Sequence, residues 1–183
     1  MNLKKPNFTN LLAVAVVATY ILIIVGATVS VRDLTACGTW PTCDGALVVA
    51  PGDEAFVSWA HRVAALLTGL VLLTTTAASF SADLPRRVRL AVVGALSLYP
   101  AQVAIGGILA VGDSFFPSVH LATAMVIFTF LLTALTWKLE DDADSDEKVA
   151  SDGETESERD VGASAPSSTF AASWEDSPNV FHR

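Results

Sequence analysis

The sequence predicts an all-α integral membrane protein, a four-helix bundle with a disordered acidic C-terminal tail. The first observation is composition: 52% of the 183 residues are hydrophobic, and the mean hydropathy is +0.50. An ordinary soluble domain of this size is less apolar. The second observation is a set of four apolar runs, each long enough to cross a bilayer. The third is a sharp division of charge along the chain.

The apolar runs are predicted to be transmembrane helices. Each is near the ~20 residues with which a helix crosses ~30 Å of hydrocarbon, and they lack the polar stripe of a surface helix. The first run is longer than the apolar core of a usual signal peptide, so we expect it to be retained. The four runs are Leu11–Val29, Phe56–Phe80, Leu90–Val111 and Pro117–Trp137.

Charge separates a membrane domain, residues 1–138, from a tail, residues 139–183. The first region contains six acidic and eight basic residues, whereas the tail contains 13 acidic and three basic residues. The tail is rich in Asp, Glu, Ser and Ala, which predicts a disordered segment in the cytoplasm. Such acidity is typical of a cytoplasm of high salt, so we expect a halophilic archaeal source. Neither region carries a net basic patch that would favour nucleic acid.

Basic residues predict the orientation of the helices in the cell membrane. They precede the first run, separate the second from the third, and follow the fourth. By the positive-inside rule, these three places are cytoplasmic. Both termini are then inside, and the loops 30–55 and 112–116 are outside. The residues concerned are Lys4, Lys5, Arg86, Arg87, Arg89 and Lys138.

The chain's two cysteines, Cys37 and Cys43, lie in the predicted outer loop. Five residues separate them, which is enough to close a small ring, and an oxidising compartment permits a disulfide. We expect this disulfide to hold Trp40 and Pro41 in a rigid cap over the helix ends. Two free thiols or a metal pair are the alternatives.

Two of the three histidines, His61 and His120, are the main candidates for a functional site. They lie near the outer ends of the second and fourth runs, so their imidazoles are expected at similar depth. An ionisable side chain in a membrane span is costly and usually faces a partner inside the bundle. The pair is predicted to bind a haem iron from both sides. Structural histidines bonded to helix carbonyls, another metal or a proton relay are the alternatives; His182 lies in the polar tail.

Two further residues are candidate haem-binding groups. Arg62 follows His61 near the outer interface, where it can pair with a haem propionate or extend to lipid headgroups. Gln102 shares a helix face with Gly106, so its amide can reach a ligand or the backbone of another helix. Small residues near the histidines leave room for a porphyrin and would equally permit close helix packing. They are Ala65, Thr68, Gly69 and Ala124.

Four segments of the chain form a combination that points to a known family. They are Gly26-Ala27-Thr28-Val29, Cys37…Trp40-Pro41…Cys43-Asp44-Gly45, His61-Arg62, and Gln102…Gly106-Gly107 followed by His120-Leu121. The Cys…Trp-Pro…Cys element and the His-Arg pair are the more specific of them. Together the segments span residues 26–121 and resemble the haem A synthase family, in its compact, half-size archaeal form.

This resemblance implies an oxidoreductase that converts the methyl group of haem O into the formyl group of haem A. His61 and His120 would be axial ligands to haem iron, and Cys37 and Cys43 would form a loop disulfide. Haem B, haem O and haem A are the implied cofactor, substrate and product. Most members carry two such halves, so the resemblance implies a homo-oligomer in the lipid bilayer, with a haem O synthase or terminal oxidase subunits as partners.

One family position differs in this sequence. The family carries a glutamate three residues before the first ligand histidine, where this chain has Ser58. Asp53 and Glu54 are the nearest outer carboxylates, so they are the candidates for a catalytic group that stabilises a cation or relays protons. Either would need a rearrangement of the loop to reach the haem, and the catalytic residue stays unassigned.

Two other functions remain open. A non-catalytic cytochrome b-like or haem-handling protein would bind one haem through the same two histidines and would leave haem O unchanged. A membrane scaffold would bind no haem and would be colourless when pure. The sequence contains no nucleotide-binding glycine loop, Ser/His/Asp set or zinc spacing that would favour a hydrolase or a kinase.

Overall fold

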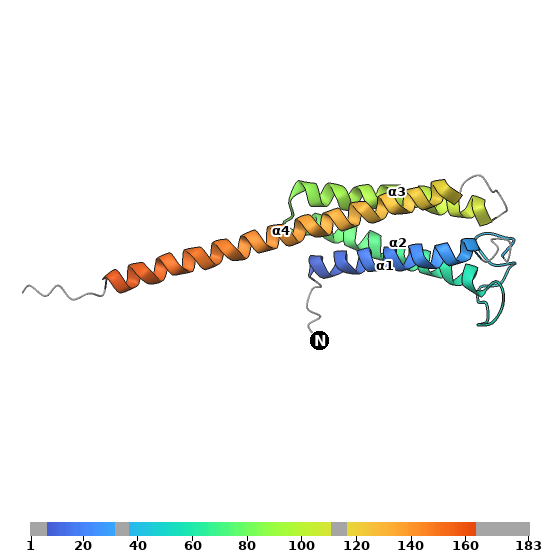
Figure 1. The fold of residues 1–183 in the computed structure, drawn as a ribbon, viewed down its shortest axis with the longest axis horizontal. Helices are drawn as coiled ribbons and strands as arrows, with labels where there is room; N and C mark the ends of the chain where they lie inside the picture. The colour runs from blue at the N-terminus through green and yellow to red at the C-terminus, as the bar shows by residue number, and fades with distance from the viewer. Residues whose placement is uncertain (1–6, 32–36, 111–116, 164–183) are drawn as a thin grey trace, which may run out of the picture. The chain divides into compact units, whose positions relative to one another are not determined.

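The described part of the chain contains four helices that run up and down in turn. The computed structural model describes residues 7–31, 37–110 and 117–163, and within these ranges it contains no strand. Figure 1 shows α1, α2, α3 and the first part of α4 running alongside one another. The helices are α1 (Phe8–Val31), α2 (Phe56–Ser81), α3 (Arg86–Ala110) and α4 (Pro117–Ala163).

All four helices are long and apolar enough to cross a membrane. The all-α class and the four predicted membrane segments are therefore confirmed, and the chain is a multi-pass membrane protein. Val111, which ends the third predicted run, lies outside the described residues, as does the predicted loop 112–116. The candidate spans are Phe8–Val29, Phe56–Ser81, Arg86–Ala110 and Pro117–Lys148.

Local sequence explains where two of the helices begin. Asn7 precedes α1, and its side-chain Oδ1 accepts the backbone N–H of Thr9 at 3.2 Å, as the residue that caps a helix N-terminus does. Pro85 precedes α3, where the missing N–H of proline costs no helical hydrogen bond. Pro100 lies inside α3, but it is exposed, and the helix continues through it.

The hydrophobic core receives side chains from every helix and lies toward the end of the bundle where α1 and α3 begin. We call this the core end, and we call the opposite end, which carries residues 37–55, the loop end. In a lipid solvent, helices associate through close van der Waals packing rather than through exclusion of water. The largest fully buried side chains of this core are Leu12, Leu72, Val88, Val92, Ile127 and Leu131.

Glycines allow aromatic side chains to approach neighbouring helices closely. A Cβ placed on Gly69 of α2 would lie 2.9 Å from Cε1 of Tyr99 on α3. The Tyr99 hydroxyl donates a hydrogen bond to the carbonyl of Ala65, one turn before Gly69. A Cβ placed on Gly94 of α3 would lie 3.6 Å from the ring of Phe130 on α4, which is an ordinary packing distance. Gly69 therefore allows Tyr99 of α3 to pack closely against α2.

α4 continues beyond residue 139, where the sequence predicts the acidic tail to begin. It ends at Ala163, and residues 164–183 lie outside the described part of the chain. Lys138 forms an ion pair with Asp142 one turn later, and Glu, Lys and Ala have favourable helix propensity. Low hydropathy therefore ends the membrane span without ending the helix. The chain divides into two compact units, Met1–Ala143 and Asp144–Arg183.

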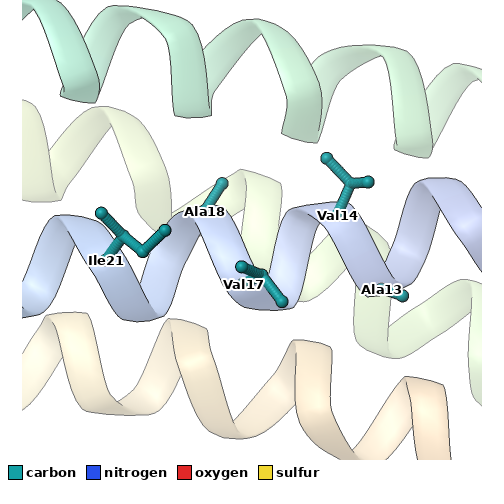
Figure 2. Close-up of a pocket in the computed structure, with 5 residues that line it drawn as sticks. All are labelled: Ala13, Val14, Val17, Ala18 and Ile21. Carbon is teal, nitrogen blue, oxygen red and sulfur yellow. The ribbon is translucent and has the colours of Figure 1, made fainter.

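An apolar groove of about 410 Å³ lies along the surface of α1 (Figure 2). Only aliphatic side chains line it, which is the surface that a transmembrane helix presents to lipid. The groove contains none of the site residues that the sequence predicts. Its lining residues are Ala13, Val14, Val17, Ala18 and Ile21.

Candidate functional site

Two partly buried imidazoles lie at the loop end of the bundle. His61 comes early in α2 and His120 comes early in α4, and both helices begin at this end (Figure 1). The structure therefore places both histidines of the sequence-based prediction at the same end of the bundle.

Each imidazole lies against a glycine of the preceding helix. A Cβ placed on Gly26 of α1 would lie 2.9 Å from Cε1 of His61, and one placed on Gly106 of α3 would lie 3.1 Å from Cε1 of His120. Both distances are too short for a normal Cβ contact, so the glycines leave the space that the rings occupy. The α1–α2 and α3–α4 pairs thus repeat one arrangement, a glycine late in the first helix facing a histidine early in the second.

Unpaired buried polar atoms gather at this site. Elsewhere in the bundle, buried hydroxyls donate to carbonyls of their own helix, as Thr75 does to Val71 at 2.7 Å. Within the described ranges, three buried side-chain atoms have no hydrogen-bond partner, namely Nδ1 of His61, Nδ1 of His120 and Oε1 of Gln102. An unpaired polar atom inside a bilayer is costly, so its persistence favours a role in binding.

The contacts of Gln102 show which ring nitrogen of His120 already accepts a hydrogen bond. Its amide Nε2 lies 3.0 Å from the carbonyl oxygen of His120 and 3.3 Å from the ring Nε2 of the same residue. A carbonyl oxygen only accepts hydrogen bonds, so the amide atom that faces it must be the donor nitrogen. The second hydrogen of that nitrogen points to the ring Nε2, which then acts as an acceptor. The ring proton of His120 therefore belongs on Nδ1, the atom without a partner.

Arg62 directs its guanidinium to the backbone of the disulfide loop. Its Nη1 donates to the carbonyls of Thr39 at 2.7 Å, Pro41 at 3.3 Å and Thr42 at 2.6 Å. Its Nη2 donates to the carbonyl of Cys37 at 3.2 Å. These four carbonyls already occupy most of the N–H donors of the Arg62 guanidinium. The expected contact between Arg62 and a haem propionate stays a prediction.

The loop that Arg62 contacts is also held by its own side chains. A disulfide joins Cys37 to Cys43, with the two Cα atoms 4.8 Å apart, and both residues are buried. The hydroxyl of Thr39 accepts the backbone N–H of Asp44 at 2.8 Å and donates to the carbonyl of Thr42 at 3.1 Å. The segment from 37 to 44 is therefore a compact unit that one side chain of α2 can position.

The candidate catalytic carboxylates lie in the loop before α2. Asp53 and Glu54 are exposed, and Oδ1 of Asp53 accepts the backbone N–H of Ala55 at 2.8 Å. This bond stabilises the turn that leads into α2. Ser58, which stands where the haem A synthase family has glutamate, is buried on α2. A catalytic role for Asp53 or Glu54 stays a prediction.

Sequence reasoning does not identify the contact between Trp40 and Gly107. A Cβ placed on Gly107 of α3 would lie 3.3 Å from Cε2 of the Trp40 indole. The available signal is the pair Gly106-Gly107, because two successive glycines in a transmembrane helix can admit side chains on two neighbouring faces. In the structure, one glycine of the pair accommodates His120 and the other accommodates Trp40.

Comparisons with known proteins find relatives of one name. No family model matches the chain. No solved structure matches it either. A protoheme IX farnesyltransferase of Haloarcula marismortui is 34% identical over 173 residues, covering 93% of this chain and 37% of that protein. One of Halobacterium salinarum is 40% identical over 137 residues (73% and 30%), and protoheme IX farnesyltransferase 1 of Natronomonas pharaonis is 37% identical over 146 residues (79% and 31%).

These relatives correct the assignment to the haem A synthase family. Their name describes transfer of a farnesyl group to protoheme IX, not oxidation of haem O. The predicted family and the predicted oxidoreductase activity are therefore wrong.

The physical reason for the error is that the motifs behind the resemblance determine the geometry of a site. They do not determine which reaction takes place there. The paired glycines accommodate the rings of His120 and Trp40, and Arg62 binds the disulfide loop. The same arrangement of residues can support more than one reaction. Ser58 was the position at which the sequence already departed from the assigned family. The chain is similar to a part of proteins named protoheme IX farnesyltransferase, and it spans 37% or less of the length of each of these three.

Proposed function

We propose that the chain binds haem B, which is protoheme IX, between His61 and His120 and takes part in its farnesylation to haem O. The observation that carries the proposal is the pair of partly buried imidazoles at the loop end, each packed against a glycine of the preceding helix. The similarity to proteins named protoheme IX farnesyltransferase supplies the reaction. Haem is the substrate in this proposal.

The donor set fits a haem. A porphyrin supplies four of the six ligands of its iron and leaves one position open on each face, which two imidazoles can fill. Facing helices of a membrane bundle are a common place for such a pair. Farnesylation modifies the porphyrin rather than the iron, so the histidines would act by holding and orienting the substrate.

Gln102 would compete with iron for His120. Its amide nitrogen contacts the ring Nε2 at 3.3 Å, and this is the lone pair that an iron would need at that nitrogen. We therefore propose that Gln102 releases Nε2 when haem binds, and that its hydrogen bond to the His120 carbonyl, at 3.0 Å, keeps it nearby. Gln102 would then help to keep His120 oriented before haem arrives.

We also infer that both termini lie in the cytoplasm and that the loop end faces the outside of the cell. Arg87 and Arg89 lie at the core end, where the guanidinium of Arg87 stacks 5.6 Å from the ring centroid of Trp137. Basic and aromatic side chains together are typical of a cytoplasmic membrane interface. A cysteine in place of Ser81, which is exposed at that end, should react with an impermeant thiol reagent only after the membrane is opened.

The partners expected from the sequence stay predictions. A homo-oligomer would be detected from the mass of the purified protein in detergent, after subtraction of the bound detergent. Association with a haem O synthase or with terminal oxidase subunits would be detected by co-purification from native membranes.

The decisive test separates haem binding from farnesyl transfer. Haem B is added to the purified full chain, and we expect the low-spin absorption spectrum of iron with two histidine ligands. His61→Ala and His120→Ala should lose this spectrum, whereas the control His182→Ala should keep it. Membranes that contain the chain are then supplied with haem B and farnesyl diphosphate, and the haems are identified by chromatography and mass.

Each outcome has a defined meaning. Haem O formed with the wild type and not with His61→Ala would support the whole proposal. Haem B that is bound but unchanged would restrict the chain to haem binding and would contradict its part in farnesylation. A purified protein that binds no haem would overturn the proposal.

A further inference from the structure

We propose that Arg62 is a positioning residue: it holds the disulfide loop over the loop end of the histidine site, so that Trp40 restricts the exchange of haem there. The inference rests on the proposed haem binding. Its structural half concerns Arg62 and Trp40 alone, so it can be tested without any haem.

Four hydrogen bonds connect Arg62 to the loop. The carbonyls of Cys37, Thr39, Pro41 and Thr42 all face its guanidinium, at distances between 2.6 and 3.3 Å. Hydrogen bonds from a charged donor are roughly twice as strong as neutral ones. A guanidinium has five N–H donors in a planar fork, whereas a lysine ammonium is a compact charge with three. The arrangement therefore requires arginine rather than a positive charge alone.

Trp40 connects the same loop to α3. A Cβ placed on Gly107 would lie 3.3 Å from Cε2, 3.4 Å from Cδ2 and 3.5 Å from Nε1 of the indole, so the ring covers this glycine. The indole remains 49% exposed, which shows that it lies at the surface of the bundle. Gly106, the preceding residue, is the one that contacts His120. Trp40 is thus anchored one residue away from the wall of the histidine site.

These contacts form a continuous connection across the loop end. Arg62 follows His61 in the chain, so one turn of α2 carries both a histidine of the site and the anchor of the loop. The loop extends from this anchor to Gly107 on α3, beside the contact of Gly106 with His120. In this proposal, haem that leaves by this end displaces the indole, and the disulfide and the four hydrogen bonds of Arg62 oppose that movement.

The experiment uses Trp40 as its own reporter. Trp59, Trp137 and Trp174 are replaced by phenylalanine, and Arg62→Lys is introduced into this background. We expect acrylamide to quench Trp40 fluorescence more strongly in Arg62→Lys than in the parent. Haem release to apomyoglobin should be faster by about tenfold, which corresponds to the loss of one or two net hydrogen bonds. Gly107→Ala should act in the same direction, because its Cβ would push the indole away.

Arg87→Lys is the matched control, since it makes the same substitution at the core end, far along α3 from Gly107. It should leave both readouts unchanged. Unchanged quenching in Arg62→Lys and in Gly107→Ala would overturn the positioning of Trp40. A haem release rate in Trp40→Ala equal to that of the wild type would overturn its role in exchange. If the wild type bound no haem, the proposed function would fail, and the quenching result would still decide where Arg62 places Trp40.

Discussion

The two ends of the bundle bury different kinds of side chain. At the core end, apolar side chains such as Leu72 and Leu131 are fully buried, and the hydroxyl of Thr76 donates to a carbonyl of its own helix. At the loop end, His61 and His120 carry ring nitrogens without partners. In lipid, an apolar core needs only close packing, whereas each polar atom needs a partner.

This difference shows which end of the bundle pairs its buried polar groups within the chain. The core end pairs its buried hydroxyls with carbonyls of the chain, while the loop end keeps hydrogen-bonding capacity that the described residues do not use. Substitutions at the core end should therefore change stability, and those at the loop end should change ligand binding.

The double substitution His61→Ala/His120→Ala should abolish haem binding. Both proposed ligands to iron are removed, and two unpaired buried nitrogens disappear with them, so unfolding in detergent should change little. Absorption spectroscopy measures the first effect and a denaturant titration measures the second. A retained low-spin spectrum, or a collapse of stability without haem, would contradict the separation of the two ends.

Leu131→Ala should lower the free energy of unfolding by about 2–5 kcal/mol, because it leaves a cavity among fully buried side chains. A titration with a denaturing detergent measures this loss. The haem affinity of the folded fraction should stay within about twofold of the wild type, since distant sites act independently. A larger change in affinity would show that the core end contributes to the site.

Gly26→Ala should weaken haem binding by the equivalent of about 1–3 kcal/mol, because its Cβ would lie 2.9 Å from the His61 ring and would push it from its place. Haem titration measures the dissociation constant. Gly94→Ala is the matched control, since its Cβ would meet Phe130 at an ordinary 3.6 Å. Equal effects of the two substitutions would show that the bundle tolerates neither, irrespective of the histidine.

Gln102→Leu should tighten haem binding by about fivefold, the equivalent of one net hydrogen bond of ~1 kcal/mol. Leucine has a similar volume and cannot donate to Nε2 of His120, so the nitrogen becomes free for iron. Haem titration again provides the measurement, with Gln102→Asn as a variant that keeps the amide but shortens its reach. Weaker binding in Gln102→Leu would show that the amide supports the bound state instead.

Much of the fold could be predicted because hydropathy and helix length are linked in a membrane. The second apolar run was expected at Phe56–Phe80, and α2 occupies Phe56–Ser81. The fourth run was expected to end at Trp137, whereas α4 continues to Ala163. Hydropathy reports where a chain leaves the lipid, and it does not report where backbone hydrogen bonding stops.

The candidate site could be predicted only in part. His61 and His120 were paired from their similar depth, because ionisable groups in a span rarely face lipid. The glycine opposite each ring, the donor role of Gln102 and the contact of Arg62 with the loop carbonyls were not predictable. They depend on the rotation of each helix about its axis, and apolar residues on every face of a membrane helix leave that rotation undetermined by pattern.

The sequence by itself determined four membrane helices, a separate acidic region, and the presence of one histidine near the same end of two helices. Each of these follows from local composition, because the cost of placing polar groups in hydrocarbon acts on every residue separately. Only the tertiary structure decided that Gly26 and Gly106 receive the histidine rings, that Arg62 binds carbonyls of the disulfide loop, and that Trp40 packs on Gly107. These features depend on contacts between residues far apart in the chain, which exist only once the helices have packed with a definite rotation.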